Sequence, residues 1–149
     1  MSKLHIGIDP GASGGIAFIS DDNPAKAWAV KMPETLADLW EYIEPYCGDS
    51  PYTFIHACLE SVHSMPGQGV ASSFKFGRGF GNLEMALTAA RIPFTYVTPQ
   101  KWQKELGCLT GGDKNVSKAR AQQLFPHIKI SHALADALLI AEFCRRTNQ

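Results

Sequence analysis

The chain has 149 residues, of which 45% are hydrophobic and 19% are charged. This size and balance are typical of one globular domain, residues 1–149, and they exclude a disordered chain. Basic and acidic residues balance overall, but residues 1–60 carry a net charge of −6 and residues 61–149 a net charge of +6. The neutral total therefore does not exclude a polyanionic partner, which would bind a local basic surface.

No apolar run is long enough to span a bilayer, and the first residues lack the apolar region of a signal peptide. We therefore expect a soluble, cytoplasmic protein with no membrane partner. The four cysteines, Cys47, Cys58, Cys108 and Cys144, form no C-x-x-C pair. This spacing argues against a zinc site or a disulfide framework and predicts buried free cysteines.

The first predicted element is a hairpin that presents a carboxylate. A buried strand over residues 4–8 ends at Asp9, residues 10–15 form a glycine-rich turn, and residues 16–19 run back as a second strand. A carboxylate at a strand end in a glycine-lined opening can bind a divalent cation and, through it, a phosphate. Asp9 can equally cap the turn by accepting hydrogen bonds from nearby backbone.

A second carboxylate follows another buried strand. Residues 25–32 are predicted to form a third strand, and Thr35 is predicted to cap an amphipathic helix. Residues 52–59 then form a mostly apolar strand, typical of a central position in a sheet, and Glu60 ends it. If this strand is parallel to the first, Glu60 and Asp9 meet at one edge of the sheet. Glu60 can otherwise be a surface residue that leaves the strand.

The middle of the chain is predicted to alternate loops, helices and one more strand. A polar loop over residues 61–73 leads into a long helix, and residues 92–97 form the fifth strand. Pro99 lies in the first turn of a short helix that carries Trp102. We interpret Trp102 as a core residue, although a base-stacking role is the alternative. A loop over residues 107–115 and a helix over residues 116–125 follow.

The last predicted helix, residues 130–144, is largely apolar, and Asp136 lies within its apolar run at residues 133–140. An unpaired ionised carboxylate in such surroundings is costly, and a metal ion would supply a partner. His132 lies four residues before Asp136 on the same helix face. His132 can be an ordinary residue at a helix terminus, but its alignment with Asp136 favours a shared site.

Asp9, Glu60 and Asp136 together suggest a metal site. Hard oxygen ligands without thiolates suit Mg²⁺ or Mn²⁺ and not zinc. A pair of such ions would support phosphodiester hydrolysis, in which one activates water and the other stabilises the leaving 3′-oxygen. His132 could bind the second ion or relay a proton.

These motifs in combination resemble the RuvC-type Holliday junction resolvases of the RNase H-like (retroviral integrase-like) superfamily. The resemblance rests on residues 7–15, Leu59-Glu60, residues 98–102 and residues 132–141. The Ser-Met-Pro-Gly-Gln-Gly loop at 64–69 is similar to that of the compact members found in phages. The resemblance implies an α/β, RNase H-like fold with a five-stranded mixed sheet flanked by helices.

The resemblance also implies an activity. Such enzymes are divalent-metal-dependent endonucleases that act as homodimers in a bacterial or phage-infected cytoplasm. They nick four-way DNA junctions symmetrically and leave 5′-phosphate and 3′-hydroxyl ends, with two Mg²⁺ or Mn²⁺ ions expected per active site. Asp9, Glu60 and Asp136 match the metal-binding acids of the family, and His132 takes the place of the fourth ligand. All four are therefore expected to be catalytic.

The chain departs from many bacterial members of this family at two places. They place the fourth ligand three residues before the final Asp, where this chain has Ala133. They also carry an aromatic residue after the Glu, in the neighbourhood of His63 and Met65. Nine residues are expected to contact DNA: His63, Met65, Lys75, Arg78, Lys101, Lys104, Lys114, Lys118 and Arg120.

Three other functions are compatible with parts of the pattern. A broader branched-DNA or flap nuclease would share the fold and the acids. A sugar-kinase or actin-like ATPase also uses an Asp-x-Gly-x-x-Gly-Gly hairpin, but it needs a second domain for which 149 residues leave no room. A non-catalytic DNA-binding module would not need the acids that this chain contains.

Overall fold

A mixed sheet of five strands forms the centre of the fold, in the order β3-β2-β1-β4-β5. The computed structural model describes residues 2–63 and 66–148. The strands are β1 (Lys3–Asp9), β2 (Gly15–Ser20), β3 (Trp28–Lys31), β4 (Phe54–Glu60) and β5 (Phe94–Val97). The first three strands form an antiparallel meander, and β1, β4 and β5 are parallel neighbours. This is the five-stranded mixed sheet that the sequence predicts.

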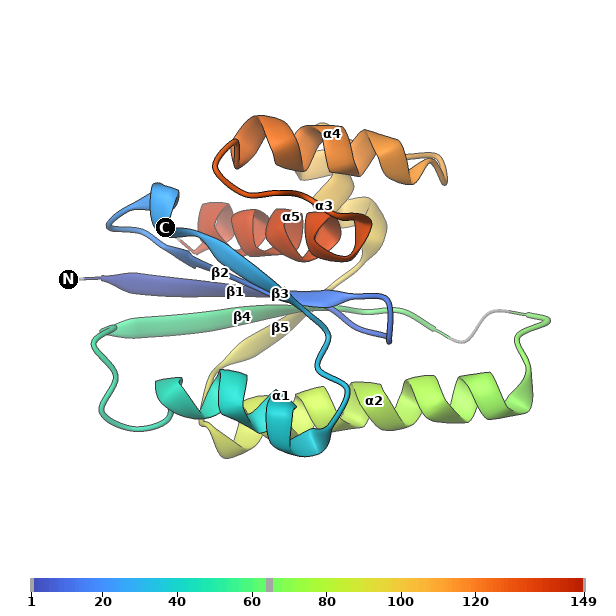
Figure 1. The fold of residues 1–149 in the computed structure, drawn as a ribbon, viewed down its shortest axis with the longest axis horizontal. Helices are drawn as coiled ribbons and strands as arrows, with labels where there is room; N and C mark the ends of the chain where they lie inside the picture. The colour runs from blue at the N-terminus through green and yellow to red at the C-terminus, as the bar shows by residue number, and fades with distance from the viewer. Residues whose placement is uncertain (1, 64–65, 149) are drawn as a thin grey trace.

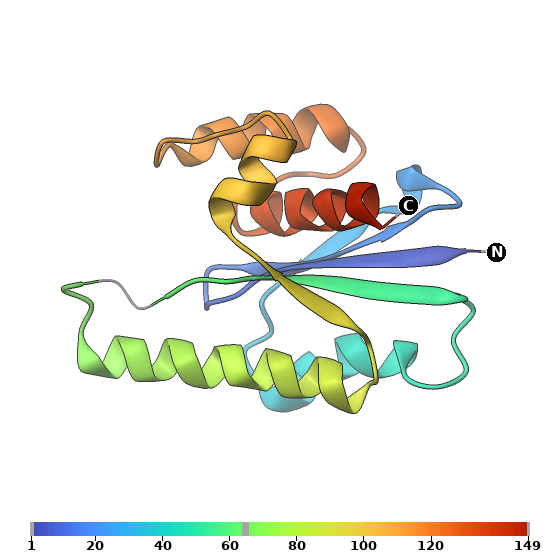
Figure 2. The ribbon, with the colours of Figure 1, turned by 180° about the vertical axis from the view of Figure 1, so that it is seen from behind.

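Helices cover both faces of this sheet, as Figure 1 shows. The helices are α1 (Leu36–Ile43), α2 (Val70–Ala89), α3 (Pro99–Glu105), α4 (Lys114–Leu124) and α5 (His132–Thr147). Helices α1 and α2 lie on one face, and α5 lies on the other with α3 beside it and α4 outside it (Figures 1 and 2). None of the helices in residues 2–63 and 66–148 combines the length and apolar character that crossing a membrane requires.

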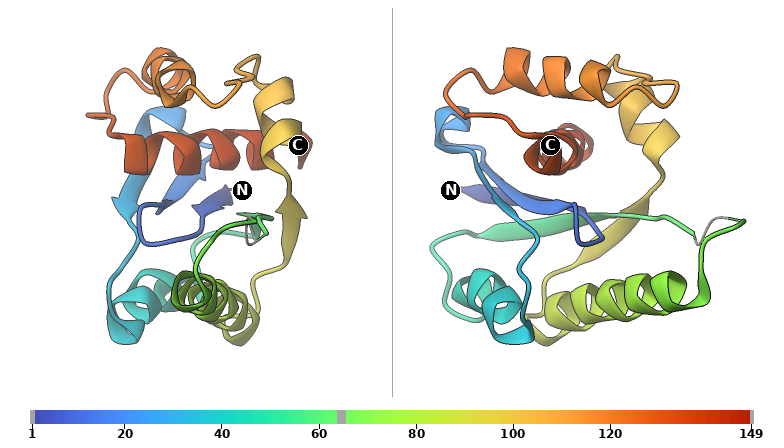
Figure 3. Two further views of the ribbon diagram at one scale, coloured as in Figure 1. Left: turned by 90° about the vertical axis from the view of Figure 1, so that its right-hand side faces the viewer. Right: turned by 45° about the vertical axis from the view of Figure 1, so that its right-hand side comes forward.

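Strand periodicity decides which residues face each layer. Leu4, Ile6 and Ile8 of β1 belong to the core under α1 and α2, together with Leu83 and Leu87 of α2. Successive strand residues point to opposite faces. The alternate residues of β1 therefore face α5 across the second core, and Figure 3 shows α5 lying between the sheet and α4.

The predicted helix cap at Thr35 is confirmed, Thr98 caps α3 in the same way, and some element bounds shift. The Thr35 hydroxyl accepts a hydrogen bond from the Asp38 amide at 3.1 Å, and the Thr98 hydroxyl accepts one from the Lys101 amide at 3.4 Å. Helix α2 begins at Val70, so the prediction of a loop up to residue 73 is wrong. Gly69 precedes the helix in an extended conformation, and the Gly69 carbonyl already accepts a helical hydrogen bond from the Ser73 amide.

Two further bounds differ for similar local reasons. Strand β3 begins at Trp28, because Pro24–Lys26 form a 3₁₀ turn where a strand was expected. Helix α4 begins at Lys114, two residues earlier than predicted, because the Asp113 carboxylate caps it by accepting the Asn115 amide at 2.9 Å. The early start moves Lys114 from a predicted loop into the first turn of a helix.

The cysteines mostly behave as predicted. Cys58, Cys108 and Cys144 are buried and free. Cys47 is exposed, so the prediction of a buried thiol is wrong there. It directly follows the short 3₁₀ helix Glu44–Tyr46, which contains no buried residue.

Helix α5 approaches the backbone of β1 and β2 closely at two glycines, Gly7 and Gly15. A Cβ atom on Gly7 would lie 2.1 Å from the Ala141 amide nitrogen and 2.4 Å from the Ala137 carbonyl oxygen. A Cβ atom on Gly15 would lie 2.8 Å from the Ala133 carbonyl oxygen. Real Cβ atoms do not approach backbone this closely, so both positions require glycine. The small residues of helix and sheet together bring the two backbones into contact.

We predict that Gly7→Ala destabilises the fold. The new methyl group must push α5 away from the sheet. Overpacking of this kind lowers the free energy of unfolding by about 1–3 kcal/mol or more. For a chain of this size, that loss corresponds to a fall in Tm of roughly 2–12 °C. Gly79→Ala is the matched control, because no atom lies within 4 Å of a Cβ there and the helix gains about 0.5–1 kcal/mol. Thermal melts of both variants would contradict the packing argument if Gly7→Ala were neutral.

Candidate functional site

Asp9 and Glu60 are neighbours at one edge of the sheet. Strands β1 and β4 are parallel, with Ile8 opposite Leu59, so the next residue of each strand is one of the two acids. Glu60 is 7% exposed and lies at the end of its strand, not beyond it. The two side chains share a hydrogen bond. Parallel pairing thus produces the juxtaposition that the sequence suggests.

Asp136 reaches the same site from α5. Its charge raises the pKa of both Asp9 and Glu60, so the three carboxyl groups interact. Ser117 of α4, which is buried, hydrogen-bonds the Asp136 carboxylate. The same hydroxyl lies 3.2 Å from the Lys114 carbonyl oxygen, so its single proton serves one acceptor at a time. Three elements distant in sequence therefore hold the acids together.

Trp102 fixes the position of Glu60. The Trp102 indole Nε1 donates a hydrogen bond to Glu60 Oε2 at 2.7 Å, and the Trp102 side chain is fully buried. The core interpretation of Trp102 is confirmed, but its role in holding Glu60 was missed. A buried indole N–H needs an acceptor, and this requirement was the available signal.

Burial and mutual repulsion make these acids hold protons. Burial, followed by repulsion from Glu60 and Asp136, raises the pKa of Asp9 to about 8. Burial is also the largest cause that raises the pKa of Glu60 to about 6 and the pKa of Asp136 above its usual range. The charge of Lys114, an exposed residue of the first turn of α4, lowers the pKa of all three, so it lies near the group. One lysine only partly offsets the buried Glu60 carboxylate and the half-buried carboxylates of Asp9 and Asp136.

The three acids fit a hard divalent cation. Across residues 2–63 and 66–148, none of them forms an ion pair within 4.0 Å. Buried carboxylates without a counter-ion are the environment that Mg²⁺ or Mn²⁺ stabilises, and oxygen donors are the ligands that both ions prefer. Within residues 2–63 and 66–148, the oxygen atoms of the three carboxylates do not all lie within 4.8 Å of one another.

His132 begins α5, one turn before Asp136, and its side chain is exposed. The charge of His132 lowers the pKa of Asp136, so the imidazole lies close to that carboxyl group. The position is compatible with a ligand at the rim of the site. Its role as fourth ligand stays a prediction.

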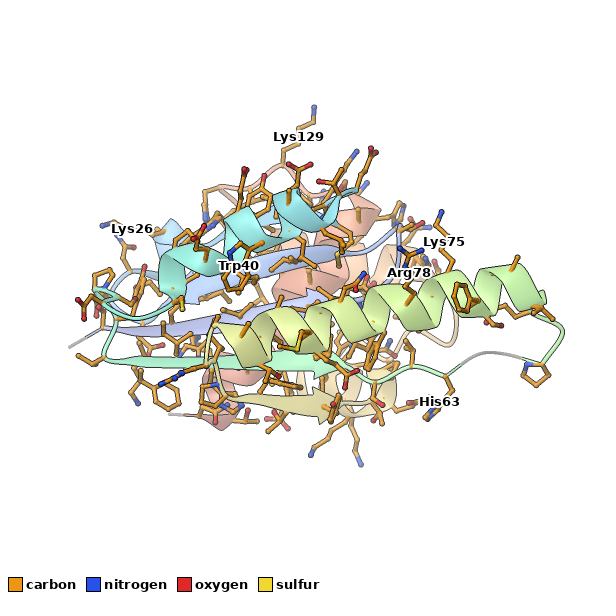
Figure 4. All side chains as sticks on the ribbon, turned by 90° about the horizontal axis from the view of Figure 1, so that it is seen from below. Lys26, Trp40, His63, Lys75, Arg78 and Lys129 are labelled. Atoms are coloured by element: carbon orange, nitrogen blue, oxygen red, sulfur yellow. The ribbon has the colours of Figure 1, made fainter. Side chains whose placement is uncertain are left out.

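Lys75 and Arg78 line a groove on the face of the sheet that α1 and α2 cover, whereas Asp9 and Glu60 point toward α5. The groove has a volume of about 870 Å³ and lies between α1, α2 and the turn after β1, where Gly11 and Ala12 border it. Figure 4 shows Lys75 and Arg78 extending from the same side of α2. The acids themselves do not line the groove, but Gly11 lies only two residues beyond Asp9.

The other residues expected to contact DNA are placed differently. His63 is exposed where the chain leaves β4, and Met65 lies outside the described residues. Lys101 and Lys104 are exposed on α3, and Lys118 is half-buried on α4. The Arg120 guanidinium donates to the Leu106 carbonyl at 2.9 Å and to Gln123 Oε1 at 3.3 Å, so it ties α4 to the end of α3. This structural use of Arg120 was not foreseen.

Known structures share this architecture over nearly the whole chain. No protein-family model and no curated protein sequence matches the chain. A solved structure of Thermus thermophilus RuvC in complex with a Holliday junction substrate matches with a TM-score of 0.63, at 16% identity, over 99% of this chain and 97% of that one. Another structure of Thermus thermophilus RuvC matches with a TM-score of 0.61, at 18% identity, over 99% and 96% of the two chains.

The chain has a RuvC-type fold. The predicted RNase H-like fold class is thereby confirmed, with the order and direction of its five strands. At these identities the likeness concerns the fold, and the roles of individual residues rest on the geometry of this chain.

We predict that the metal-free protein loses stability as the pH rises. The folded-state pKa of Asp9, about 8, lies above its unfolded value, so the contribution of Asp9 is full at acidic pH and is lost as the pH rises through about 8. Asp9→Asn removes the buried charge and should raise the free energy of unfolding at pH 8 by about 0.5–2 kcal/mol, a gain typical of relieved active-site strain. Denaturant unfolding in EDTA between pH 5 and 9 measures the difference. Parallel curves for the two proteins would contradict the shifted pKa.

Proposed function

We propose that this protein is a divalent-metal-dependent DNA endonuclease that resolves four-way junctions. The observation that carries the proposal is the convergence of Asp9, Glu60 and Asp136 from β1, β4 and α5 in a RuvC-type fold. One of the similar solved structures is that of a RuvC bound to a Holliday junction substrate, which supports branched DNA as the ligand. The role would belong to DNA recombination and repair, in the cytoplasm of a bacterium or of a phage-infected host.

The proposed chemistry assigns each residue a task. Asp9, Glu60 and Asp136 would hold Mg²⁺ or Mn²⁺, with His132 at the rim as a further ligand or a proton relay. Bound ions of this kind supply an activated water and stabilise a leaving 3′-oxygen, which leaves 5′-phosphate and 3′-hydroxyl ends. Trp102 keeps the Glu60 carboxylate oriented through its hydrogen bond. Lys114 faces the acids and can neutralise charge on a phosphate held between them.

The groove along α2 gives a path for one strand of the substrate. Lys75 and Arg78 line it and can neutralise phosphates, while Phe76 contributes an aromatic surface. Phosphate contacts of this kind position the duplex without reading its sequence. The exposed lysines of α3 and Lys114 would extend the basic surface on the other side of the acids.

We propose a homodimer, with the exposed face of α2 as its contact surface. Phe74 and Met85 on this face are 71% and 61% exposed. Gly77 and Gly81 lie on the same helix, and no atom within the described chain comes within 4 Å of a Cβ at either position. Large apolar side chains beside glycines leave room for another backbone to approach closely. Two copies related by a two-fold axis would present two active sites to the two symmetric strands of a junction.

A nuclease that cuts flaps and other branched DNA is the second candidate. The acids and the groove would serve it equally well, because neither distinguishes the geometry of the branch. Product symmetry separates the two functions, since only a paired enzyme acting on a junction gives matched nicks in opposite strands.

We predict that Asp9→Asn, Glu60→Gln and Asp136→Asn each lower junction cleavage by at least about 100-fold, because even partners outside the ligand shell are worth 10- to 100-fold at metal sites. Junction binding should remain. The assay compares a four-way junction, a 5′-flap and linear duplex with Mg²⁺, Mn²⁺ or EDTA. Glu41→Gln, an exposed acid on α1, is the matched control and should cleave normally.

The outcomes separate the hypotheses. Paired symmetric nicks on the junction alone support a resolvase, and comparable cutting of the flap supports the broader nuclease. Cleavage retained in all three variants would overturn the site, and tight binding without cleavage in any metal would leave a non-catalytic module.

We also predict that Lys75→Ala and Arg78→Ala weaken junction binding and reduce its salt dependence. Each lost phosphate contact should lower the slope of log K against log salt by about 0.9. Lys129→Ala is the control, because Lys129 lies well apart from Lys75 and Arg78 in Figure 4. Binding is measured by fluorescence anisotropy in the Asp9→Asn background, so that cleavage does not interfere. Equal slopes for all the proteins would exclude the groove as the DNA path.

A further inference from the structure

A second group of potential metal ligands lies on β4 and α5, away from the three acids. The ligand atoms of His56, Cys58 and Cys144 all lie within 4.8 Å of one another. His56 and Cys58 are two residues apart on one strand and so point to the same face of the sheet. Cys144 reaches them from α5, which packs on that face. The fold thus brings together cysteines that the sequence spacing separates.

Two of the three side chains of this group are buried, and the third is half-buried. Cys58 is 1% exposed and Cys144 is fully buried, while His56 is half-buried at the edge of the group. Thr95 of β5 completes one side, with its hydroxyl 3.3 Å from His56 Nε2 and 3.5 Å from Cys58 Sγ. Cys144 Sγ lies 3.5 Å from the His56 carbonyl oxygen. The proposed nuclease chemistry uses none of these side chains.

We propose that His56, Cys58 and Cys144 bind one zinc ion. Zinc prefers thiolate and imidazole ligands at about 2.3 and 2.0–2.1 Å, which sets neighbouring donor atoms of a tetrahedral site roughly 3.3–3.8 Å apart. Because the present separations are at most 4.8 Å, binding requires a contraction of no more than about 1–1.5 Å, within the reach of side-chain rotation. On binding, the two thiols release their protons to solvent, and two thiolates balance the charge of the ion. A neutral complex avoids the cost of burying net charge.

Two groups could occupy the fourth coordination position: the Thr95 hydroxyl or a water molecule. Thr95 Oγ1 already touches both His56 and Cys58, and the half-buried imidazole leaves an approach for water. Three protein ligands with one exchangeable position are a known zinc arrangement. Hard ions such as Mg²⁺ would not compete, because they prefer oxygen donors.

This site would link the two elements that carry two of the acids. Cys58 lies two residues before Glu60 on β4, and Cys144 lies eight residues after Asp136 on α5. An ion bound between them would fix α5 to β4 without touching the substrate. The proposal does not depend on nuclease activity, since metal binding is measured directly.

The test uses Co²⁺ as a spectroscopic substitute for Zn²⁺. Full-length protein is titrated under a non-thiol reductant, with Mg²⁺ in excess to occupy the acidic site. We expect one Co²⁺ per chain with a thiolate-to-cobalt charge-transfer band, and displacement of the ion by stoichiometric Zn²⁺. Cobalt bound only to carboxylates gives no such band, so the readout separates the two sites.

Matched variants make the assignment specific. His56→Ala and Cys144→Ser should lose the band and weaken Zn²⁺ binding by more than about 100-fold, measured by chelator competition, since even indirect partners cost 10- to 100-fold. Cys47→Ser and Cys108→Ser, which lie outside the group, should keep it, and so should Asp9→Asn. Zn²⁺ should raise the Tm of the unmodified protein but not that of His56→Ala.

Circular dichroism first establishes which variants are folded. His56 is only half-buried, so His56→Ala remains informative if Cys144→Ser fails to fold. No thiolate band in the unmodified protein would overturn the proposal. So would a band that survives His56→Ala, or one lost in Cys47→Ser.

Discussion

The contact between the backbones of α5 and β1 is the constraint on which the site depends. Gly7 and Gly15 remove the side chains that would separate helix from sheet, and alanines on α5 do the same from the other side. Asp136 lies among those alanines. The close approach of α5 to the sheet therefore places the Asp136 carboxylate near the edge of the sheet at which β1 ends in Asp9 and β4 ends in Glu60. A bulkier residue at Gly7 would move the third acid away while leaving the other two in place. The geometry of the site therefore depends directly on the packing between α5 and the sheet.

The arrangement is unfavourable for the protein alone. Three carboxylates share a poorly solvated edge: burial raises the pKa of each, and repulsion raises the pKa of Asp9 and Glu60 further. The hydrogen bonds from Trp102 and Ser117 and the charge of Lys114 hold the acids in place without cancelling this repulsion. Two apolar cores, one on each face of the sheet, stabilise the fold and offset the unfavourable free energy of bringing the three carboxylates together. A divalent cation would turn the same repulsion into binding energy, which is why such acids are typical of metal sites.

The sequence predicts the parts of this site that follow from local pattern. Apolar strands that end in Asp9 and Glu60, with parallel pairing, are sufficient to place those two acids side by side. The caps at Thr35 and Thr98 follow from side-chain chemistry in the same way. The partners of the acids cannot be predicted from local pattern. Trp102 and Ser117 reach the acids through tertiary packing, which the spacing of residues in the sequence does not reveal. The same limit applies to the cysteines: the absence of a C-x-x-C pair says nothing of Cys58 and Cys144, which α5 brings together from 86 positions apart.

One face of β4 carries both kinds of ligand. His56, Cys58 and Glu60 alternate along the strand and so point toward α5, which contributes Cys144 near its end and Asp136 near its start. Soft donors and hard donors are thus separated along the same two elements, and in the proposed sites each set would suit a different class of ion. Because Cys58 and Glu60 share β4 and Cys144 and Asp136 share α5, a movement of one element against the other at the cysteines can also change the spacing of Glu60 and Asp136. Zinc at one end would therefore restrict the distance between the acids at the other, which is the distance on which a two-ion reaction depends.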